Sequence, residues 1–194
     1  MSKQIQLPAS ESVIRDLKIG DEVLISGMMV TARDAAHKYI IENWPEWLEP
    51  ILKESMIYHC GPVVGKLPDG GWKFVAAGPT TSIREEPYEA SVMEHYTVRA
   101  VIGKGGMGDT TLAGLQKVGG VYLHAIGGLA ASLAESVVKV HDVYMLEELG
   151  VPEAFWHIEV KDFPAVVTMD SHGGSLHKTI KEQSDVIARK LIHG

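Results

Sequence analysis

The feature that most limits the fold of this chain is the alternation of strand-like and helix-like segments through its middle part. The strand-like runs are rich in β-branched and aromatic residues and are bounded by turn-forming residues. They lie at residues 23–29, 56–64, 72–77, 98–102, 121–125, 137–145, 155–160 and 166–169. Alternating strands and helices, with extra strands near both ends, predict an α/β fold with a mixed sheet, or two stacked sheets, and a helical layer.

Stretches in which apolar residues recur at helical spacing fill most of the gaps between these strands. They lie at residues 31–42, 44–54, 82–95, 109–118, 129–135 and 175–192. Thr31 is a candidate N-cap for the first of these helices, and the last helix is amphipathic. No repeat, linker or low-complexity segment divides the chain, so residues 1–194 are expected to form one domain with a flexible lead at residues 1–9.

The composition excludes several classes of function. The chain carries 18 Lys and Arg against 25 Asp and Glu, a formal charge of −7, whereas a nucleic-acid-binding domain needs a basic face. Its single cysteine, Cys60, permits no intrachain disulfide and is typical of a reducing compartment. The first residues contain no apolar signal segment, and the longest apolar stretch, 121–134, is interrupted by Gly and His. We therefore expect a soluble cytoplasmic protein that binds neither nucleic acid nor membranes.

Three segments each carry one cation at a turn between a strand and a helix, namely Arg33, Arg84 and Lys104. Open α/β sheets bind ligands at the carboxyl ends of their strands, where helix N-termini also favour anions. Arginine can hold a carboxylate through two parallel hydrogen bonds, and lysine acts as a mobile point charge. The pattern predicts that these cations converge on a small molecule with two carboxylates.

Each of these residues also has a structural interpretation. A single Arg in the first turn of a helix is usually solvated, and Thr or Ser there usually caps the helix. The loop 103–108 fits the dinucleotide pattern G-x-G-x-x-G, but the acidic residue expected about 20 positions later is missing. A dinucleotide-binding module and a structural subunit without catalytic groups therefore remain as alternatives.

The histidines and the single cysteine do not predict a metal centre. The nine histidines show none of the spacings of metal-binding motifs, and one cysteine cannot form a C-x-x-C pair. We expect no metal site on this chain. Residues 170–173 (DSHG) contain the residue types of a catalytic triad, but as sequence neighbours they indicate a turn at a strand end.

Four segments together resemble one enzyme family. Residues 31–37 (TARDAAH) are similar to its T-A-R-D-x-A-H signature, and residues 58–64 (YHCGPVV) to its Y-x-x-G-P-V-V strand. Residues 78–84 (GPTTSIR) resemble its G-P-T-T-S-x-R segment, and residues 101–107 (VIGKGGM) its I-G-K-G-G-M loop. The resemblance covers about residues 19–175 and is to the beta subunit, or C-terminal domain, of class I iron–sulfur fumarate hydratases and L(+)-tartrate dehydratases.

This resemblance implies a swivelling β/β/α domain and a hydro-lyase activity. The reaction would be the reversible hydration of fumarate to (S)-malate, as in the tricarboxylic acid cycle, or alternatively the dehydration of L(+)-tartrate to oxaloacetate. The resemblance also implies a [4Fe–4S] cluster held by the cysteines of a partner alpha subunit, in a hetero-oligomer in which this chain also self-associates.

The resemblance carries roles over to four residues of this chain. Arg33, Arg84 and Lys104 would bind the substrate carboxylates. Thr80, together with Lys104, would be catalytic, with Thr80 taking part in proton abstraction. The segment 83–86, with Ile83 and two glutamates, departs from the Met-containing sequence expected there.

The isolated chain is predicted to carry no stoichiometric iron and no hydratase activity. An iron–sulfur cluster needs about three or four protein thiolates, and Cys60 is the only cysteine. Iron and acid-labile sulfide analysis of the anaerobically purified chain measures this directly. About four iron atoms per chain would contradict the prediction.

Overall fold

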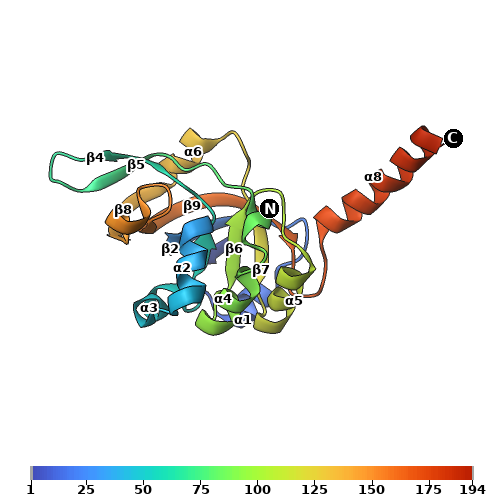
Figure 1. The fold of residues 1–194 in the computed structure, drawn as a ribbon, viewed down its shortest axis with the longest axis horizontal. Coiled ribbons are helices and arrows are strands. Elements are labelled where there is room, and N and C mark those ends of the chain that lie inside the picture. Colours follow the sequence, from blue (N-terminus) through green and yellow to red (C-terminus); the bar gives the residue numbers. More distant parts are fainter. Residues whose placement is uncertain (1, 194) are drawn as a thin grey trace.

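A computed structural model describes residues 2–193 of the chain (Figure 1). The strands are β1 (Lys3–Gln6), β2 (Glu22–Thr31), β3 (Met56–Tyr58), β4 (Val63–Lys66), β5 (Trp72–Ala76), β6 (Ala100–Gly103), β7 (Val121–His124), β8 (Val137–Tyr144) and β9 (Phe155–Met169). The helices are α1 (Glu11–Arg15), α2 (Asp34–Asn43), α3 (Glu49–Leu52), α4 (Glu89–Tyr96), α5 (Asp109–Val118), α6 (Ala130–Glu135), α7 (Leu146–Leu149) and α8 (Leu176–His193), and the 3₁₀ turns are η1 (Glu46–Leu48) and η2 (Ser82–Glu85).

One mixed sheet organises these elements, as the sequence predicted. Its strand order is β1-β2-β3-β6-β7-β9-β8, and β2 also pairs with β9. Neighbours from β1 to β7 run parallel, whereas β9 is antiparallel to β2, β7 and β8. Because β9 pairs with both β7 and β2, the strands β2-β3-β6-β7-β9 form a closed circuit. The hairpin β4–β5 is a separate, two-stranded sheet.

The central parallel strands β3, β6 and β7 are buried on both faces. In β6, Ala100 and Ile102 belong to an apolar cluster with β2 and β9, while Val101 points to a second cluster formed with helices α2, α4 and α5. The same alternation holds in β3 and β7. Burial on both faces explains why these strands read as continuous apolar runs.

The register of the parallel strands places their ends in one row. Thr31 of β2 pairs with Tyr58 of β3, Tyr58 pairs with Ile102 of β6, and Ile102 pairs with Leu123 of β7. Segments that follow these strands therefore leave the sheet at one edge, which is where open α/β sheets carry their ligands.

The expected flexible lead at residues 1–9 was wrong for the part that the structure describes. Residues 3–6 form β1, which pairs in parallel with residues 23–26 of β2. Ile5 and Leu7 are buried in the apolar cluster. The alternation of apolar and polar residues in this segment extends over only a few positions. Such a short pattern is too weak to predict a strand from the sequence.

Two expected boundaries also differ. Thr31 does not cap α2: it ends β2, and its Oγ1 accepts a hydrogen bond from the Trp156 backbone N–H. The two strands expected at 155–160 and 166–169 form one continuous strand, β9. Asp162 has a positive φ of 49°, and its N–H donates to Ser26 Oγ, so the strand bends there without leaving the sheet.

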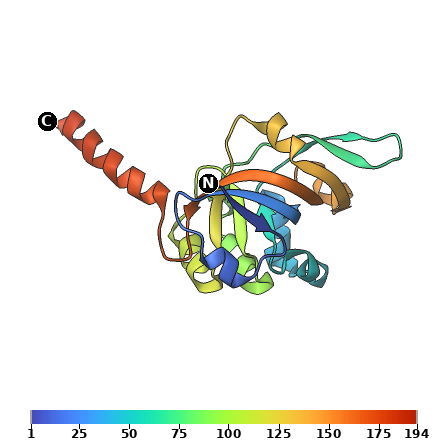
Figure 2. The ribbon, with the colours of Figure 1, turned by 180° about the vertical axis from the view of Figure 1, so that it is seen from behind.

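Helix α8 projects from the body of the domain, as Figures 1 and 2 show from opposite sides. Its first turn is tied down, because His177 Nε2 lies 2.9 Å from Thr168 Oγ1 and Lys178 Nζ lies 3.1 Å from an Asp109 oxygen. Further along, Ile187 and Leu191 are exposed. Within residues 2–193, none of the helices combines the length and the apolarity of a membrane span.

Deletion of residues 181–194 is predicted to leave the domain folded, with the melting temperature changed by less than about 3 °C. The removed side chains contribute little to the core, since Leu191 is 82% and Ile187 60% exposed. Circular dichroism melting measures the effect, with Ile102→Ala as the control. Ile102 is fully buried, so its truncation should cost about 2–5 kcal/mol. A loss from the deletion as large as that of the control would contradict the prediction.

Candidate active site

Two of the four predicted site residues follow strands of the row, and the other two follow β5 of the separate hairpin. Arg33 comes two residues after the end of β2 and is the N-cap residue of α2. Lys104 directly follows β6. Thr80 lies in the loop after β5, and Arg84 lies in η2. The fold thus gathers residues from positions 33 to 104 at one edge of the sheet.

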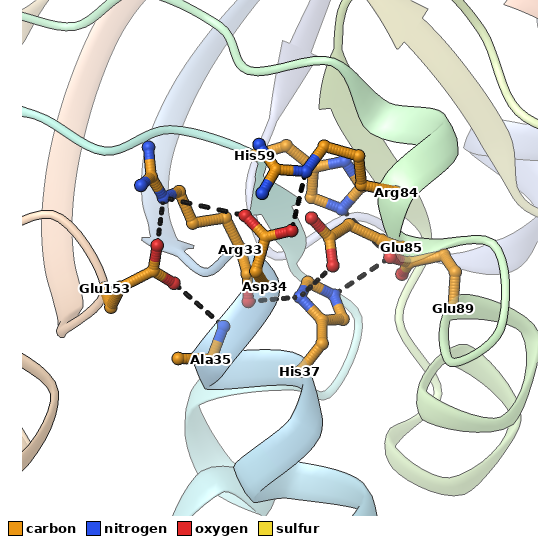
Figure 3. Close-up of polar contacts among 9 residues, drawn as sticks. All are labelled: Arg33, Asp34, Ala35, His37, His59, Arg84, Glu85, Glu89 and Glu153. Atoms are coloured by element: carbon orange, nitrogen blue, oxygen red, sulfur yellow. Dashed lines mark hydrogen bonds and ion pairs between the residues drawn. The ribbon is translucent and has the colours of Figure 1, made fainter.

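Arg33 and Arg84 are joined by one carboxylate, that of Asp34 (Figure 3). Arg84 Nε lies 2.8 Å from Asp34 Oδ1, and Arg33 Nε lies 4.0 Å from Asp34 Oδ2. Arg33 Nε also donates to Glu153 Oε1 at 2.5 Å. Glu153 follows the 150–152 turn before β9, so a distant segment fixes this guanidinium.

Both guanidinium groups are therefore held through their Nε atoms. Among the described residues, no hydrogen bond or ion pair involves the terminal Nη atoms of Arg33 or Arg84. Arg84 is exposed and Arg33 is partly exposed, with its Nη1 beside Gly61. The outer edge of each fork remains available for a carboxylate, which it can bind through two parallel hydrogen bonds.

Thr80 and Lys104 are brought together by their backbones. Lys104 N–H donates to Thr80 O at 3.2 Å, and Ser82 N–H donates to Lys104 O at 3.0 Å. Thr80 N–H in turn donates to His59 O, just beyond β3, at 2.7 Å. In the described part of the chain the Lys104 ammonium forms no ion pair, and its side chain runs beside Gly127. The structure thus joins the four residues as two pairs, Arg33 with Arg84 and Thr80 with Lys104.

Acidic side chains occupy N–H groups at the N-termini of α2 and α5, at this edge of the sheet. Glu153 Oε2 accepts the Ala35 N–H of α2 at 2.9 Å. Glu86 accepts the N–H groups of Gly108 at 2.7 Å and Thr110 at 3.0 Å at the start of α5. A dinucleotide pyrophosphate would need the amides that Glu86 fills, so this contact argues against the dinucleotide alternative.

Behind the arginines lies a buried polar network that the sequence analysis missed. Its members are His37 of α2, His59 after β3, Glu85 of η2 and Glu89 of α4, and all four are 0% exposed. Glu89 Oε2 lies 2.9 Å from His59 Nε2 and 3.0 Å from His37 Nε2 (Figure 3). His37 Nδ1 lies 3.1 Å from Arg33 O, which connects the network to the site.

The charges of this network follow from its burial and its contacts. Burial opposes ionisation of Glu89, but His37 and then His59 outweigh it and lower the pKa of Glu89 to about 2. Burial also opposes a charge on His37, yet Glu89 and Glu85 raise the net pKa of His37. Burial lowers the pKa of His59. These shifts favour a charged His37 paired with an ionised Glu89, and a neutral His59.

The same network contains the residue types of a metal site. The potential ligand atoms of His37, His59 and Glu89 lie within 4.8 Å of one another. However, a histidine bound to metal through Nε2 carries its proton on Nδ1 and donates it to an acceptor. His59 Nδ1 has no hydrogen-bond partner among the described residues. The contacts of His59 therefore fit a proton-linked network, in which this histidine donates through Nε2, better than a metal centre.

One groove, beside the C-terminal helix, lies apart from these residues. It encloses about 730 Å³ in the open angle between α8 and the loop 105–109. Its walls include His177, Lys178 and Ile180, and none of the four predicted site residues lines it. Its size reflects the projection of α8, so it does not mark the chemistry.

The sequence analysis predicted the cations of the site and missed the acidic and histidine side chains around them. Asp34 lies inside the TARDAAH segment, so its position next to Arg33 was a visible but unused signal. Glu153, His59 and Glu89 come from segments far from Arg33 in the sequence. Their contacts depend on the order of the strands in the sheet. No fixed spacing along the chain relates these residues to one another, so no sequence motif could predict the contacts.

Comparison with known proteins identifies the family to which this chain is similar. The profile of the family described as "Fumarase C-terminus" matches residues 1–180. "Putative fumarate hydratase class I" of Geobacillus stearothermophilus is 53% identical over 181 residues, which are 93% of this chain and 34% of that protein. "Putative L(+)-tartrate dehydratase subunit beta" of Methanocaldococcus jannaschii is 45% identical over 88% of each chain. "L(+)-tartrate dehydratase subunit beta" of Escherichia coli K12 is 36% identical over 98% of this chain and 96% of its own.

This α/β domain, with its cations at one edge of the sheet, thus matches fumarase-type domains along nearly its whole sequence. The chain belongs to the Fumarase C-terminus family. It spans about a third of the Geobacillus protein, 34% of its length, and most of the two proteins named as beta subunits.

Replacement of Glu85 is predicted to stabilise the protein at alkaline pH. Burial raises the pKa of Glu85 to about 7 from an ordinary value of 4.5. Between these values the folded protein keeps a proton that the unfolded chain releases, so the free energy of unfolding falls as pH rises from 4.5 to 7. Glu85→Gln has no ionisable group at this position, so its free energy of unfolding should not fall in this way. The variant should be more stable than the original protein by about 2–3 kcal/mol at pH 8, with no gain at pH 4.5.

Urea unfolding of both proteins between pH 4.5 and pH 8 measures the difference. Glu42→Gln, on the exposed face of α2, is the control and should follow the original protein at every pH. Parallel pH profiles for Glu85→Gln and the original protein would show that Glu85 ionises in the folded state without cost.

Proposed function

We propose that this chain is the beta subunit of an iron–sulfur-dependent hydro-lyase that interconverts fumarate and (S)-malate. In this proposal it supplies carboxylate-binding and proton-transfer groups to a site that it shares with an alpha subunit. The observation that carries the proposal is the pair of guanidinium groups, Arg33 and Arg84, held through Nε with their terminal nitrogens unengaged. They lie in a domain of the fumarase family.

The substrate explains why such an arrangement is needed. A small dianion loses strong hydration when it leaves water, and fixed positive charge must replace that hydration. Asp34 holds Arg84, and Glu153 holds Arg33, so neither fork needs to be ordered when the ligand arrives. A fork whose direction is already fixed loses less entropy on binding a carboxylate.

Thr80 and Lys104 suit the proton-transfer half of the reaction. Dehydration of malate removes a proton from one carbon and a hydroxyl group from its neighbour. A threonine hydroxyl is a weak base unless it is ionised, so its alkoxide needs cations nearby. The Lys104 backbone pairs with that of Thr80, and the Lys104 ammonium forms no ion pair within the described residues, so it can supply that charge or bind the second carboxylate.

The cluster that the family resemblance implies does not fit the residues of this chain. Cys60 is its only cysteine and is 1% exposed, and burial raises the pKa of its thiol to about 12. One buried, protonated thiol cannot hold an iron–sulfur cluster. We therefore assign the cluster to a cysteine-bearing alpha subunit, and no step of the reaction to metal on this chain. The names of two relatives, which contain "subunit beta", support the existence of such a partner.

The second candidate is L(+)-tartrate dehydration to oxaloacetate. It is favoured by two relatives named as tartrate dehydratase beta subunits, of which the match covers 88% and 96%. Tartrate differs from malate by one hydroxyl group, and both substrates present two carboxylates to the same cations. Co-expression with the alpha subunit, anaerobic reconstitution and assay of fumarate, malate and tartrate distinguish the two reactions. Separate, non-interacting subunits on size-exclusion chromatography would refute the proposal.

Substitutions at the four residues are predicted to lower the activity of the reconstituted complex in different ways. Arg33→Lys and Arg84→Lys should each cost about 30- to 1,000-fold in kcat/KM, because one ammonium cannot replace a bidentate fork. Thr80→Val should lower kcat with little change in KM, since it removes the hydroxyl and keeps the shape. Steady-state kinetics of each purified complex measures these values.

Thr81→Val is the matched control. Thr81 is exposed and lies next to Thr80, so its substitution should have a mild effect. Full activity in both arginine variants, with normal assembly, would rule out a shared dicarboxylate site.

A further inference from the structure

We propose that Glu89 is a positioning residue, which holds the segments of Arg33 and Thr80 in a fixed relation through His37 and His59. The inference rests on the proposed function, because it concerns the residues to which that function assigns the reaction. Neither the family match nor the names of the relatives gives Glu89 a role.

The geometry of Glu89 is that of a bridge. It lies on α4, and one oxygen, Oε2, meets the imidazole of His59 at 2.9 Å and that of His37 at 3.0 Å. The two rings meet edge to face, with their centroids 5.1 Å apart. A single carboxylate thus joins α2, α4 and the end of β3, three elements that are distant in sequence.

Each imidazole leads to one site residue. On the α2 side, His37 Nδ1 lies 3.1 Å from Arg33 O, and the His37 N–H donates to the same oxygen at 2.8 Å. On the β3 side, His59 O accepts the Thr80 N–H at 2.7 Å. Glu89 is therefore separated from the backbones of Arg33 and Thr80 by one histidine in each direction.

A purely stabilising role explains this network poorly. Taking an ion pair out of water costs several kcal/mol, and apolar residues of similar volume often serve stability as well or better. An apolar cluster with Val92, Met93 and Ile40 already packs α4 against α2 and the sheet. What an apolar side chain cannot supply is a directed polar contact, such as the hydrogen bond between Glu89 Oε2 and His59 Nε2 and the ion pair between Glu89 Oε2 and His37 Nε2. The free-energy cost of burying the ion pair is offset if the proposed reaction requires fixed positions of Arg33 and Thr80.

The first test uses the full chain alone and needs no catalysis. Amide hydrogen exchange is followed by NMR in the original protein, Glu89→Leu, Glu89→Gln and the control Glu94→Leu, which changes an exposed position of the same helix. In Glu89→Leu, the amides of Thr80 and His37 should exchange about tenfold faster or more, while that of Ile102 in β6 is unchanged. Glu89→Gln keeps the shape and an accepting oxygen, so it should restore both rates, and Glu94→Leu should have no effect.

The second test uses the complex with the alpha subunit. Glu89→Leu should lower kcat/KM about 10- to 100-fold, and Glu89→Gln should recover activity to within about threefold of the original. If Glu89→Leu does not fold, His59→Leu takes its place. That variant breaks only the Thr80 side, so the Thr80 amide should exchange faster while the His37 amide does not.

Three results would overturn the proposal. Unchanged exchange at Thr80 and His37 in Glu89→Leu would show that the bridge fixes nothing, and equal acceleration at Ile102 would show a general loss of stability. One equivalent of metal in the original chain, lost in His59→Leu, would make Glu89 a metal ligand. If the original complex neither hydrates fumarate nor dehydrates L(+)-tartrate, the proposed function fails, and the exchange rates still decide the role of Glu89.

Discussion

The register of the parallel strands determines where the candidate catalytic groups lie. Thr31 and Ile102 both pair with Tyr58 of the strand between them. Arg33 and Lys104 each follow two residues later, so the two cations leave the sheet at the same level. A slip of one residue in either pairing would turn the following side chains to the opposite face of the sheet. The two-sided apolar packing of β3 and β6, which makes such a slip costly, is thus also what positions the site.

The same packing explains what could be predicted from the sequence. β6, β7 and α5 lie close to the expected positions, because long apolar runs and helical spacing are local signals. β1 was missed because its burial depends on pairing with β2. Arg33 and Lys104 were found because each sits at a strand end within a short motif. The bridge between His59 and Glu89, which are 30 residues apart, follows only from the way α4 packs beside β3.

The acidic side chains around the cations answer an electrostatic problem. Two guanidinium groups at one edge repel each other until an anion lies between them. Asp34 supplies that anion, and Glu153 fixes Arg33 from the other side. The contacts engage Nε, so Asp34 and Glu153 reduce this repulsion while the terminal nitrogens stay open. A chain with a formal charge of −7 can in this way present a local anion-binding surface.

In the proposed reaction, the groups on this chain would account for only one half of a hydration. Within the described residues, the site offers fixed forks for carboxylates, a hydroxyl and an unpaired ammonium. Adding or removing the hydroxyl group of the substrate needs a strong electrophile or acid, and the single buried thiol provides no means of holding a metal here. Under the proposed function, the missing group would come from the exposed side of the site, where Arg84 and the neighbouring Thr81 meet solvent. The site is rigid on the buried side, where the Glu89 network lies, and open on the other side. Under the proposed function, two chains need both properties in order to share one reaction.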